Sequence, residues 1–173
     1  MREVYVFDID GVLLYAGSSL IYRLGTLEPL SHPSMNSKFS RRVTPRDLGI
    51  KLLMDRSVKG RVILVTGRPE RKRGLTIAQL KELGVYKHID ALLMRRDDDC
   101  RPEWEVKPEL LEAFVDNPYS VLEIHEDNER VLKAYSKRFP YALLYLHEGR
   151  SFNLYDPSRP YSRTLDLVEE GLY

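Results

Sequence analysis

The sequence predicts an α/β fold, a Rossmann-like three-layer sandwich in which helices cover both faces of a five-stranded, mainly parallel sheet. Short β-rich runs alternate along the chain with segments of helical period. Each run is almost continuously apolar, as expected of a strand buried on both faces. The chain has 173 residues, 43% of them hydrophobic and 31% charged, which suits one folded domain and is too short to argue for two.

Five runs are predicted strands. They are Val4–Phe7, Val62–Val65, Ala91–Met94, Val121–Ile124 and Ala142–Leu146. Four segments between them are predicted helices, and a fifth helix follows the last strand. These are Pro45–Arg56, Glu70–Leu83, Pro108–Val115, Glu129–Arg138 and Leu165–Glu170. Thr44 is expected to cap the first helix because Pro45 suits a first helical turn, and Gly84 is expected to end the second.

One long polar segment interrupts this alternation. Tyr15–Val43, which contains SHPSMNSKFSRR, follows the first strand, and loops of that length inside a compact domain are usually functional or mobile. We therefore expect a single domain over residues 1–173 with a lid or cap insert at about 15–43. Basic and aromatic residues of the insert suit contacts with a nucleic-acid backbone and its bases, or equally a solvated lid. They are Tyr22, Arg23, Lys38, Phe39, Arg41 and Arg42.

Charge and composition exclude several classes of protein. Lys and Arg total 27 against 26 for Asp and Glu, so no general polyanion-binding surface is expected. Cys100 is the single cysteine, which rules out an intrachain disulfide and a thiolate metal cage and favours a reducing, cytoplasmic setting. No apolar run approaches the ~20 residues of a membrane span, and the N-terminus lacks the apolar region of a signal peptide. We expect no membrane partner, and the oligomeric state stays open.

Polar side chains gather where the predicted strands end. In an open parallel sheet the ligand lies outside the carboxyl ends of the strands. Strand one ends in Asp8 and Asp10, and a central place for this strand, in the order 3-2-1-4-5, brings it beside the ends of strands two and four. The candidates at those two ends are Thr66, Gly67, Arg68, Glu126 and Asp127.

Each candidate also has an ordinary structural interpretation. Thr66 can cap the helix that follows it, and the acidic pair after strand four can be acids favoured by the dipole of a helix N-terminus. Lys107, in VKPELL, can be a solvated lysine at a helix start. Each of these structural interpretations is reasonable alone. Taken together they are less convincing, because chance would have to place all of these polar groups in the right order on the right strand ends.

Four motifs in chain order resemble the haloacid dehalogenase (HAD) superfamily of aspartyl-phosphate phosphohydrolases. They are DIDGV, VTGR, a lysine heading a helix and an acidic pair after the fourth strand, and together they span most of the chain. The resemblance implies that Asp8 is the nucleophile and that Asp10 is the general acid and base. It also implies that Thr66, next to Gly67, binds a phosphoryl oxygen.

The implied chemistry explains why carboxylates stand at the end of an apolar strand. Carboxylate attack on phosphorus gives an acyl phosphate and splits one hard step into two. Several carboxylates and a phosphate cannot share a pocket without a hard cation, so Mg²⁺ is the expected cofactor. Its implied ligands are an Asp8 oxygen, the Asp10 backbone carbonyl and Asp127, with Glu126 beside it. Lys107 would hold the Asp8 charge and the phosphate together.

Within the superfamily, the chain resembles the 3′-phosphatase domain of polynucleotide kinases. Arg68 directly after ThrGly, and the segment LLMRRDDDCRPEWEVKPELL with Arg101 and Lys107, match that pattern. The resemblance implies that Gly67, Arg68, Arg101 and Lys107 join Thr66 in binding the phosphate and the substrate. Glu126 departs from it, since an aspartate is usual there, and no kinase P-loop of the form GxxxxGK[ST] is present. The resemblance implies a magnesium-dependent phosphatase acting through an aspartyl phosphate on the 3′-phosphate of a nucleotide or polynucleotide. A kinase or ligase partner would be a separate polypeptide.

Four alternatives compete with this interpretation. A HAD phosphatase of a small metabolite would carry the same motifs, and a non-catalytic phosphate-binding module would retain the same groups. A phosphoacceptor receiver domain would place its acidic pair first and its lysine last, whereas Lys107 precedes the acids of strand four here. A calcium loop starting at Asp8 would need an oxygen ligand and a glutamate where the chain has Val12 and Ser19.

Overall fold

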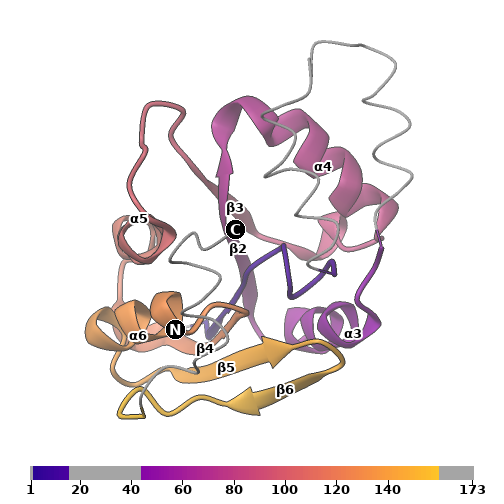
Figure 1. Cartoon of the computed structure of the whole chain (residues 1–173). Helices are drawn as coiled ribbons and strands as arrows, with labels where there is room; N and C mark the ends of the chain where they lie inside the picture. Colours follow the sequence, from indigo (N-terminus) through magenta and orange to yellow (C-terminus); the bar gives the residue numbers. More distant parts are fainter. Residues whose placement is uncertain (1, 16–43, 160–173) are drawn as a thin grey trace.

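The computed structural model describes residues 2–15 and 44–159, and within them the α/β sandwich is confirmed (Figure 1). The strands of these regions form one sheet in the order β3-β2-β1-β4-β5-β6, parallel except for β6, which runs antiparallel to β5. Their bounds are β1 (Val4–Phe7), β2 (Arg61–Pro69), β3 (Ala91–Arg95), β4 (Val121–Glu126), β5 (Leu143–Glu148) and β6 (Ser151–Leu154). The first strand is therefore central, between the strands that carry the other motifs.

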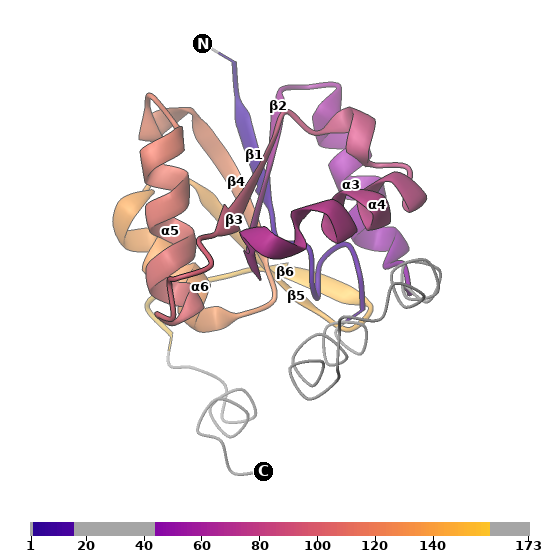
Figure 2. The ribbon, with the colours of Figure 1, turned by 90° about the horizontal axis from the view of Figure 1, so that it is seen from above.

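Helices cover both faces of this sheet (Figure 2). They are α3 (Asp47–Ser57), α4 (Arg73–Glu82), α5 (Glu103–Phe114) and α6 (Glu129–Arg138), with short 3₁₀ turns at Glu70–Lys72, Tyr86–His88 and Pro118–Ser120. Because successive strand residues point to opposite faces, Tyr5 and Phe7 enter the core under α3 and α4, and Val4 and Val6 enter the core under α5 and α6. The strand is thus apolar throughout because both of its faces are buried.

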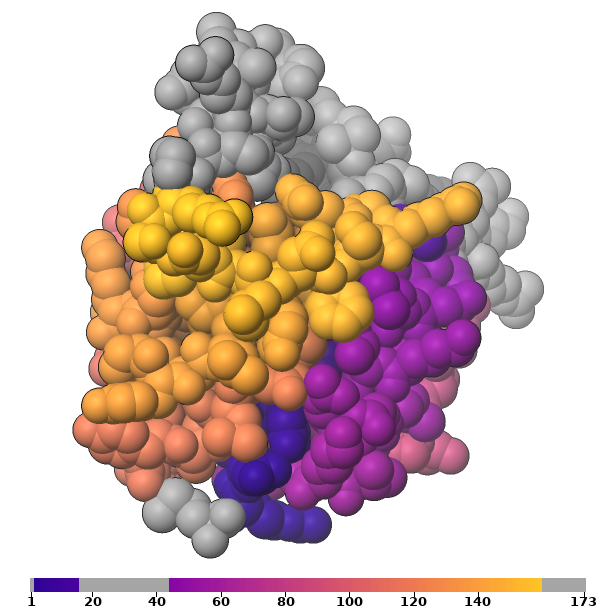
Figure 3. Space-filling view, turned by 90° about the horizontal axis from the view of Figure 1, so that it is seen from below, coloured from indigo at the N-terminus to yellow at the C-terminus, as the bar shows by residue number. Residues whose placement is uncertain are grey.

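The sheet has one strand more than the sequence predicted. β5 turns at Gly149 and Arg150 and returns as β6, and Gly149 has a φ of +52° that favours glycine. Figure 3 shows this hairpin crossing the molecule between the α6 and α3 sides. β6 is partly exposed, so it lacks the continuous apolar run by which the other strands were recognised.

Three helix starts differ from the prediction. α4 begins at Arg73 because a 3₁₀ turn occupies Glu70–Lys72. α3 begins at Asp47, with Arg46 rather than Thr44 at its cap position, because Pro45 pairs with Leu14 and Arg46 N donates to Leu13 O, which keeps the chain extended. α5 begins at Glu103, five residues before Pro108, which lies inside the helix. Proline was taken as a first-turn signal, but here the helix tolerates the loss of one backbone hydrogen bond.

The residues that flank the predicted insert lie side by side. Tyr15 N donates to Thr44 O at 3.0 Å, and Leu14 forms a bridge with Pro45, so the two ends of segment 16–43 meet. The lid or cap itself, with its basic and aromatic residues, and the helix predicted at Leu165–Glu170 lie outside the described residues. Among the described helices, none is both long and apolar enough to span a membrane.

Candidate active site

Three carboxylates meet at the carboxyl ends of β1 and β4. Phe7 pairs with His125 in the parallel register, so Asp8, which follows β1, lies beside Glu126, the last residue of β4. Asp8 N also donates to His125 O at 2.9 Å. One carboxylate oxygen each from Asp8, Glu126 and Asp127 lies within 4.8 Å of the others. The predicted nucleophile and acidic pair are therefore brought together.

Lys107 reaches this cluster from the second turn of α5. Its side chain is buried, and Nζ lies 3.1 Å from Asp8 Oδ2 and 2.9 Å from Glu126 Oε2. Glu103 Oε2, one turn back on the helix, lies 3.6 Å away. Burial alone would lower the pKa of Lys107, but the surrounding carboxylates raise it well above the ordinary value. The lysine is therefore a permanent cation inside the site.

The carboxylates carry more negative charge than this single cation balances. Burial first, and then the charge of Glu126, raises the pKa of Asp8 well above its ordinary value. Burial raises the pKa of Glu126 to about 8, and burial with the charge of Asp8 raises that of Asp127 to about 7. A divalent cation would remove this penalty, and all the donors are the oxygen ligands that Mg²⁺ prefers. The residues present thus fit a magnesium ion.

Gly11 makes room for the third carboxylate. It has a φ of +85°, and a Cβ built on it would lie only 2.0 Å from Asp127 Oδ2. The glycine of the DIDG motif therefore serves both the left-handed turn after Asp10 and the close approach of Asp127.

The Asp10 carboxylate forms an ion pair with Arg68. Arg68 Nε lies 2.8 Å from Asp10 Oδ2 and Nη2 lies 2.7 Å from Oδ1, a two-pronged ion pair. Gln79 Oε1 accepts from Arg68 Nη1 at 2.6 Å, and Thr76 Oγ1 lies 3.3 Å from the same nitrogen. Arg68 was predicted to bind substrate; here it orients the predicted acid–base residue, and its contact with a phosphate stays a prediction.

Thr66 and Gly67 lie on the neighbouring strand β2, beyond the last residue paired with β1. The Thr66 side chain is buried and its Oγ1 accepts from Arg68 N at 3.2 Å. A Cβ on Gly67 would lie 2.0 Å from Glu103 Oε1, so a larger residue there would require the Glu103 side chain to move. Gly67 O accepts from Arg95 Nε at 2.9 Å.

Arg101 is engaged outside the carboxylate cluster. Its guanidinium pairs with Asp99 at 2.8 Å and with Glu109 at 2.9 Å, and its side chain is 44% exposed. Arg101 therefore links Asp99, on the loop after β3, to Glu109, on the exposed side of α5, through two ion pairs. Its predicted role in substrate binding stays a prediction.

A buried hydrogen-bonded chain behind the site was not anticipated. An arginine only donates, so His147 Nδ1 accepts from Arg46 Nη1 at 2.7 Å, and its Nε2 carries the proton donated to His125 Nδ1 at 2.9 Å. His125 Nε2 then donates to Glu123 Oε2 at 3.0 Å. The His125 ring stacks on Phe7 with centroids 4.3 Å apart, so these hydrogen-bonded residues support the strand that leads to Asp8.

Arg46 is the centre of this support. It is only 1% exposed, and it donates to Val12 O at 3.2 Å, Gly149 O at 2.8 Å and Ser151 O at 2.7 Å. It thus joins the turn after Asp10, the end of segment 16–43 and the β5–β6 hairpin. In sequence it is one arginine among many, so nothing in the local pattern marked it.

Comparisons with known proteins agree with this geometry. The family model described as the polynucleotide kinase PNKP phosphatase domain matches residues 2–139. A chain of the Pnkp1/Rnl/Hen1 RNA repair complex is 23% identical with a TM-score of 0.62, and a chain of another Pnkp1/Rnl/Hen1 structure is 22% identical with a TM-score of 0.63. Each match covers 84% of this chain but only 42% and 46% of those chains, so the chain spans less than half of their length.

More distant structures share the fold. The HAD-hydrolase YfnB from Bacillus subtilis, bound to magnesium, is 12% identical over 83% of this chain and 87% of its own, with a TM-score of 0.57. No curated protein matches the chain significantly. The family match extends over most of the chain and includes all four motifs. The chain therefore belongs to the family of the polynucleotide kinase PNKP phosphatase domain and is a HAD-type phosphatase.

Proposed function

We propose that this phosphatase is magnesium-dependent, works through an aspartyl phosphate on Asp8, and removes the terminal 3′-phosphate of a polynucleotide. The observation that carries the proposal is the cluster in which Lys107 lies 3.1 Å from Asp8 while Glu126 and Asp127 stand beside it. Asp8 is buried in a cluster whose negative charge exceeds the charge of its one cation, Lys107. This is expected of a nucleophile that works with a bound metal ion beside a phosphoryl group.

Each of these residues has a separate role in the proposed reaction. Asp8 Oδ attacks phosphorus, the bond from phosphorus to the 3′-oxygen breaks, and Asp10 gives its proton to that oxygen. Asp10 then takes a proton from the water that hydrolyses the acyl phosphate, which returns Asp8 and releases inorganic phosphate. Arg68 orients Asp10 through both of its oxygens, and Thr66 donates to a phosphoryl oxygen. A bound magnesium ion would neutralise charge on the phosphoryl oxygens.

Asp127 is the better candidate for the third metal ligand. Both oxygens of Glu126 already have partners, since Oε2 lies 2.9 Å from Lys107 Nζ and Oε1 accepts from Asp127 N at 3.1 Å. Glu126 is therefore assigned to holding Lys107, and Asp8, the Asp10 carbonyl and Asp127 to holding the metal. This also accounts for a glutamate here, because its longer side chain reaches the lysine.

Substrate and partners are inferred from the family. The match to a polynucleotide kinase phosphatase domain favours a nucleic-acid end over a small metabolite. The similar chains named above belong to complexes that include Rnl and Hen1, which supports a kinase or ligase on a separate polypeptide for this phosphatase. The cytoplasmic setting is part of the same proposal. A small-metabolite phosphatase remains the second candidate because the described cluster would serve either substrate.

The test compares a 3′-phosphorylated oligonucleotide, a nucleoside 3′-monophosphate and sugar phosphates, each with magnesium. We expect phosphate release from the 3′-phosphates at rates well above those for sugar phosphates, and none with chelator or with Asp8→Asn. Asp116→Asn, at an exposed acid just after the last turn of α5, is the matched control and should retain activity. Full activity of Asp8→Asn or in chelator would refute the mechanism, and equal rates on sugar phosphates would refute the substrate.

A further inference from the structure

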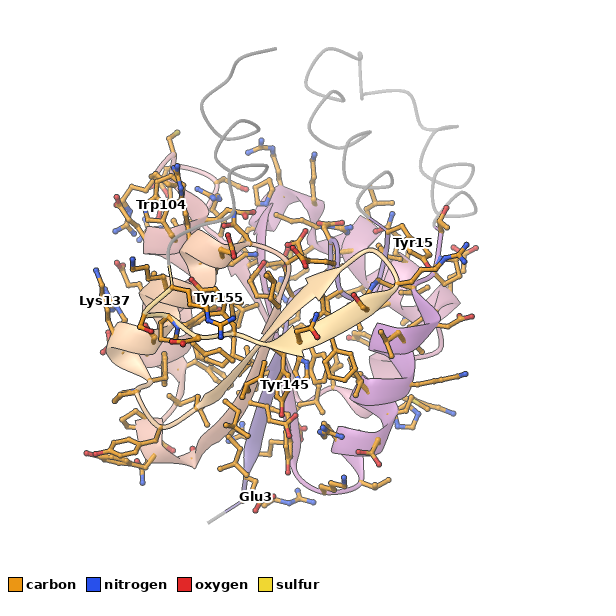
Figure 4. The ribbon with its side chains drawn as sticks, turned by 60° about the horizontal axis from the view of Figure 1, so that its bottom comes forward. Glu3, Tyr15, Trp104, Lys137, Tyr145 and Tyr155 are labelled. Atoms are coloured by element: carbon orange, nitrogen blue, oxygen red, sulfur yellow. The ribbon has the colours of Figure 1, made fainter. Side chains whose placement is uncertain are left out.

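A basic and aromatic strip runs along α6, on the face of the sheet shared with α5. A hollow of about 450 Å³ extends from the start of α5 along α6 and is lined by Trp104, Arg130, Lys133, Ala134 and Lys137. The Arg130 guanidinium lies over the Trp104 ring, 5.4 Å from its centroid. Figure 4 shows Trp104 and Lys137 on the same flank of the molecule.

A second hollow continues the strip beyond Lys137. It has a volume of about 240 Å³ and shares Lys137 with the first. Tyr119 and Tyr141 border it, 65% and 70% exposed, with ring centroids 5.1 Å apart. Arg138 also borders it and is paired with Glu112. No acid is among the described residues that line either hollow, although acids and bases are nearly equal in the whole chain.

The strip starts beside the site. Arg130 lies three residues after Asp127, and Trp104 is next to Glu103, which contacts Lys107. Arg130, Lys133 and Lys137 repeat at helical spacing on one face of α6. From Arg130 to Lys137 the helix rises about 10 Å, which spans about three phosphates of one strand at the B-form spacing.

This combination suits one ligand. Exposed aromatic rings such as those of Tyr119 and Tyr141 stack with bases whatever their identity, and nearby cations follow the backbone, which is how single strands are bound without sequence preference. Trp104 is half-buried and packs against the core, so it borders the strip at its edge. We propose that the strip from Trp104 along α6 to Tyr119 and Tyr141 binds the single-stranded polynucleotide leading to the terminal phosphate at Asp8. The inference rests on the proposed function for the identity of that phosphate, and it adds the site that selects long substrates.

Binding can be measured without turnover. Trp104 is the only tryptophan, so quenching of its fluorescence by a ten-nucleotide strand with a 3′-hydroxyl, in chelator, reports occupation of the strip directly. With three cations engaged, log affinity should fall with log salt at a slope of about −2. The double variant Lys133→Glu/Lys137→Glu should lose at least about tenfold in affinity and flatten the slope.

Controls separate this inference from the proposed function. Lys51→Glu/Lys87→Glu makes the same charge change at exposed lysines on the α3 and α4 side and should bind as the wild type does. The strip variant should hydrolyse a nucleoside 3′-monophosphate normally but lose its preference for a 3′-phosphorylated ten-mer. Absence of quenching, or equal loss in both double variants, would overturn the strip while leaving the phosphatase intact. Failure on every 3′-phosphate with normal quenching would overturn the proposed function alone.

Discussion

The buried pair of His147 and His125 should make the fold sensitive to acid, and His147→Gln tests this. Burial, with the charges of His125 and Arg46, lowers the pKa of His147 from 6.5 to about 3. Glutamine keeps an acceptor and a donor but cannot titrate near neutral pH. It therefore removes the proton-linked part of the stability while retaining much of the hydrogen-bonded chain.

The sign and size of this pH effect on stability follow from the pKa of His147 in the folded and in the unfolded chain. A base whose folded pKa is depressed contributes stability that is fully present above its unfolded pKa and is lost as pH falls toward the folded pKa. At pH 5 the unfolded chain binds a proton at His147 and the folded chain does not, which favours unfolding by about 2 kcal/mol relative to pH 7. This free energy requires only that the pKa of His147 in the folded chain lies well below 5. His147 is 2% exposed, so solvent does not screen the effect.

Urea unfolding of both proteins at pH 7 and pH 5 measures the effect. Asp8, Glu126 and Asp127 have raised pKa values, so in the absence of metal they favour the folded state as pH falls and oppose His147 in the raw curves. These contributions cancel in the difference between wild type and variant. The difference should shrink by about 2 kcal/mol from pH 7 to pH 5. A pH-independent difference would refute the assignment of His147 as a buried neutral base.

Three other variants probe the site. Lys107→Met should unfold in urea with about 3–5 kcal/mol less stability, because it leaves buried carboxylates without their cation; a loss below about 1 kcal/mol would contradict the pairing. Gly11→Ala should stay folded by circular dichroism yet need more magnesium for half-maximal activity, since its Cβ would displace Asp127, and an unchanged magnesium requirement would argue against Asp127 as a ligand. Arg68→Lys should lower kcat more than it raises KM because lysine cannot hold both oxygens of Asp10. Arg96→Lys, at an exposed ion pair, is the control and should change neither constant. A rise in KM alone for Arg68→Lys would indicate that Arg68 contacts the substrate instead.

Sequence pattern predicted a strand or helix correctly where the evidence lies within the residues of that element. Continuous apolar runs predicted all the strands that are buried on both faces, and the carboxylates that follow the apolar runs of β1 and β4 were correctly predicted to meet. The partly exposed β6 and the true start of α5 were missed, because an exposed edge strand has weak hydrophobic periodicity and a proline can lie inside a helix.

Long-range partners could not be predicted from any pattern. Asp10 and Arg68 are 58 residues apart in the chain, and Arg46 and His147 are 101 apart, yet each pair is in direct contact. Local residue types do not reveal whether an arginine is solvated or, as Arg46 is, buried among backbone carbonyls. Such a side chain is stable only when several distant segments supply acceptors at once.

The sequence by itself determined the fold class, the central strand and the set of groups that meet at its end, because periodicity and strand-end position are properties of short segments. The resemblance already implied the pair of Lys107 with Asp8. The tertiary structure decided the other partners: Glu126 with Lys107, Arg68 with Asp10, and Arg101 with Asp99 and Glu109. The physical reason is that the free energy of a charge depends on burial and on neighbours within a few ångströms, and folding brings those neighbours from distant parts of the chain.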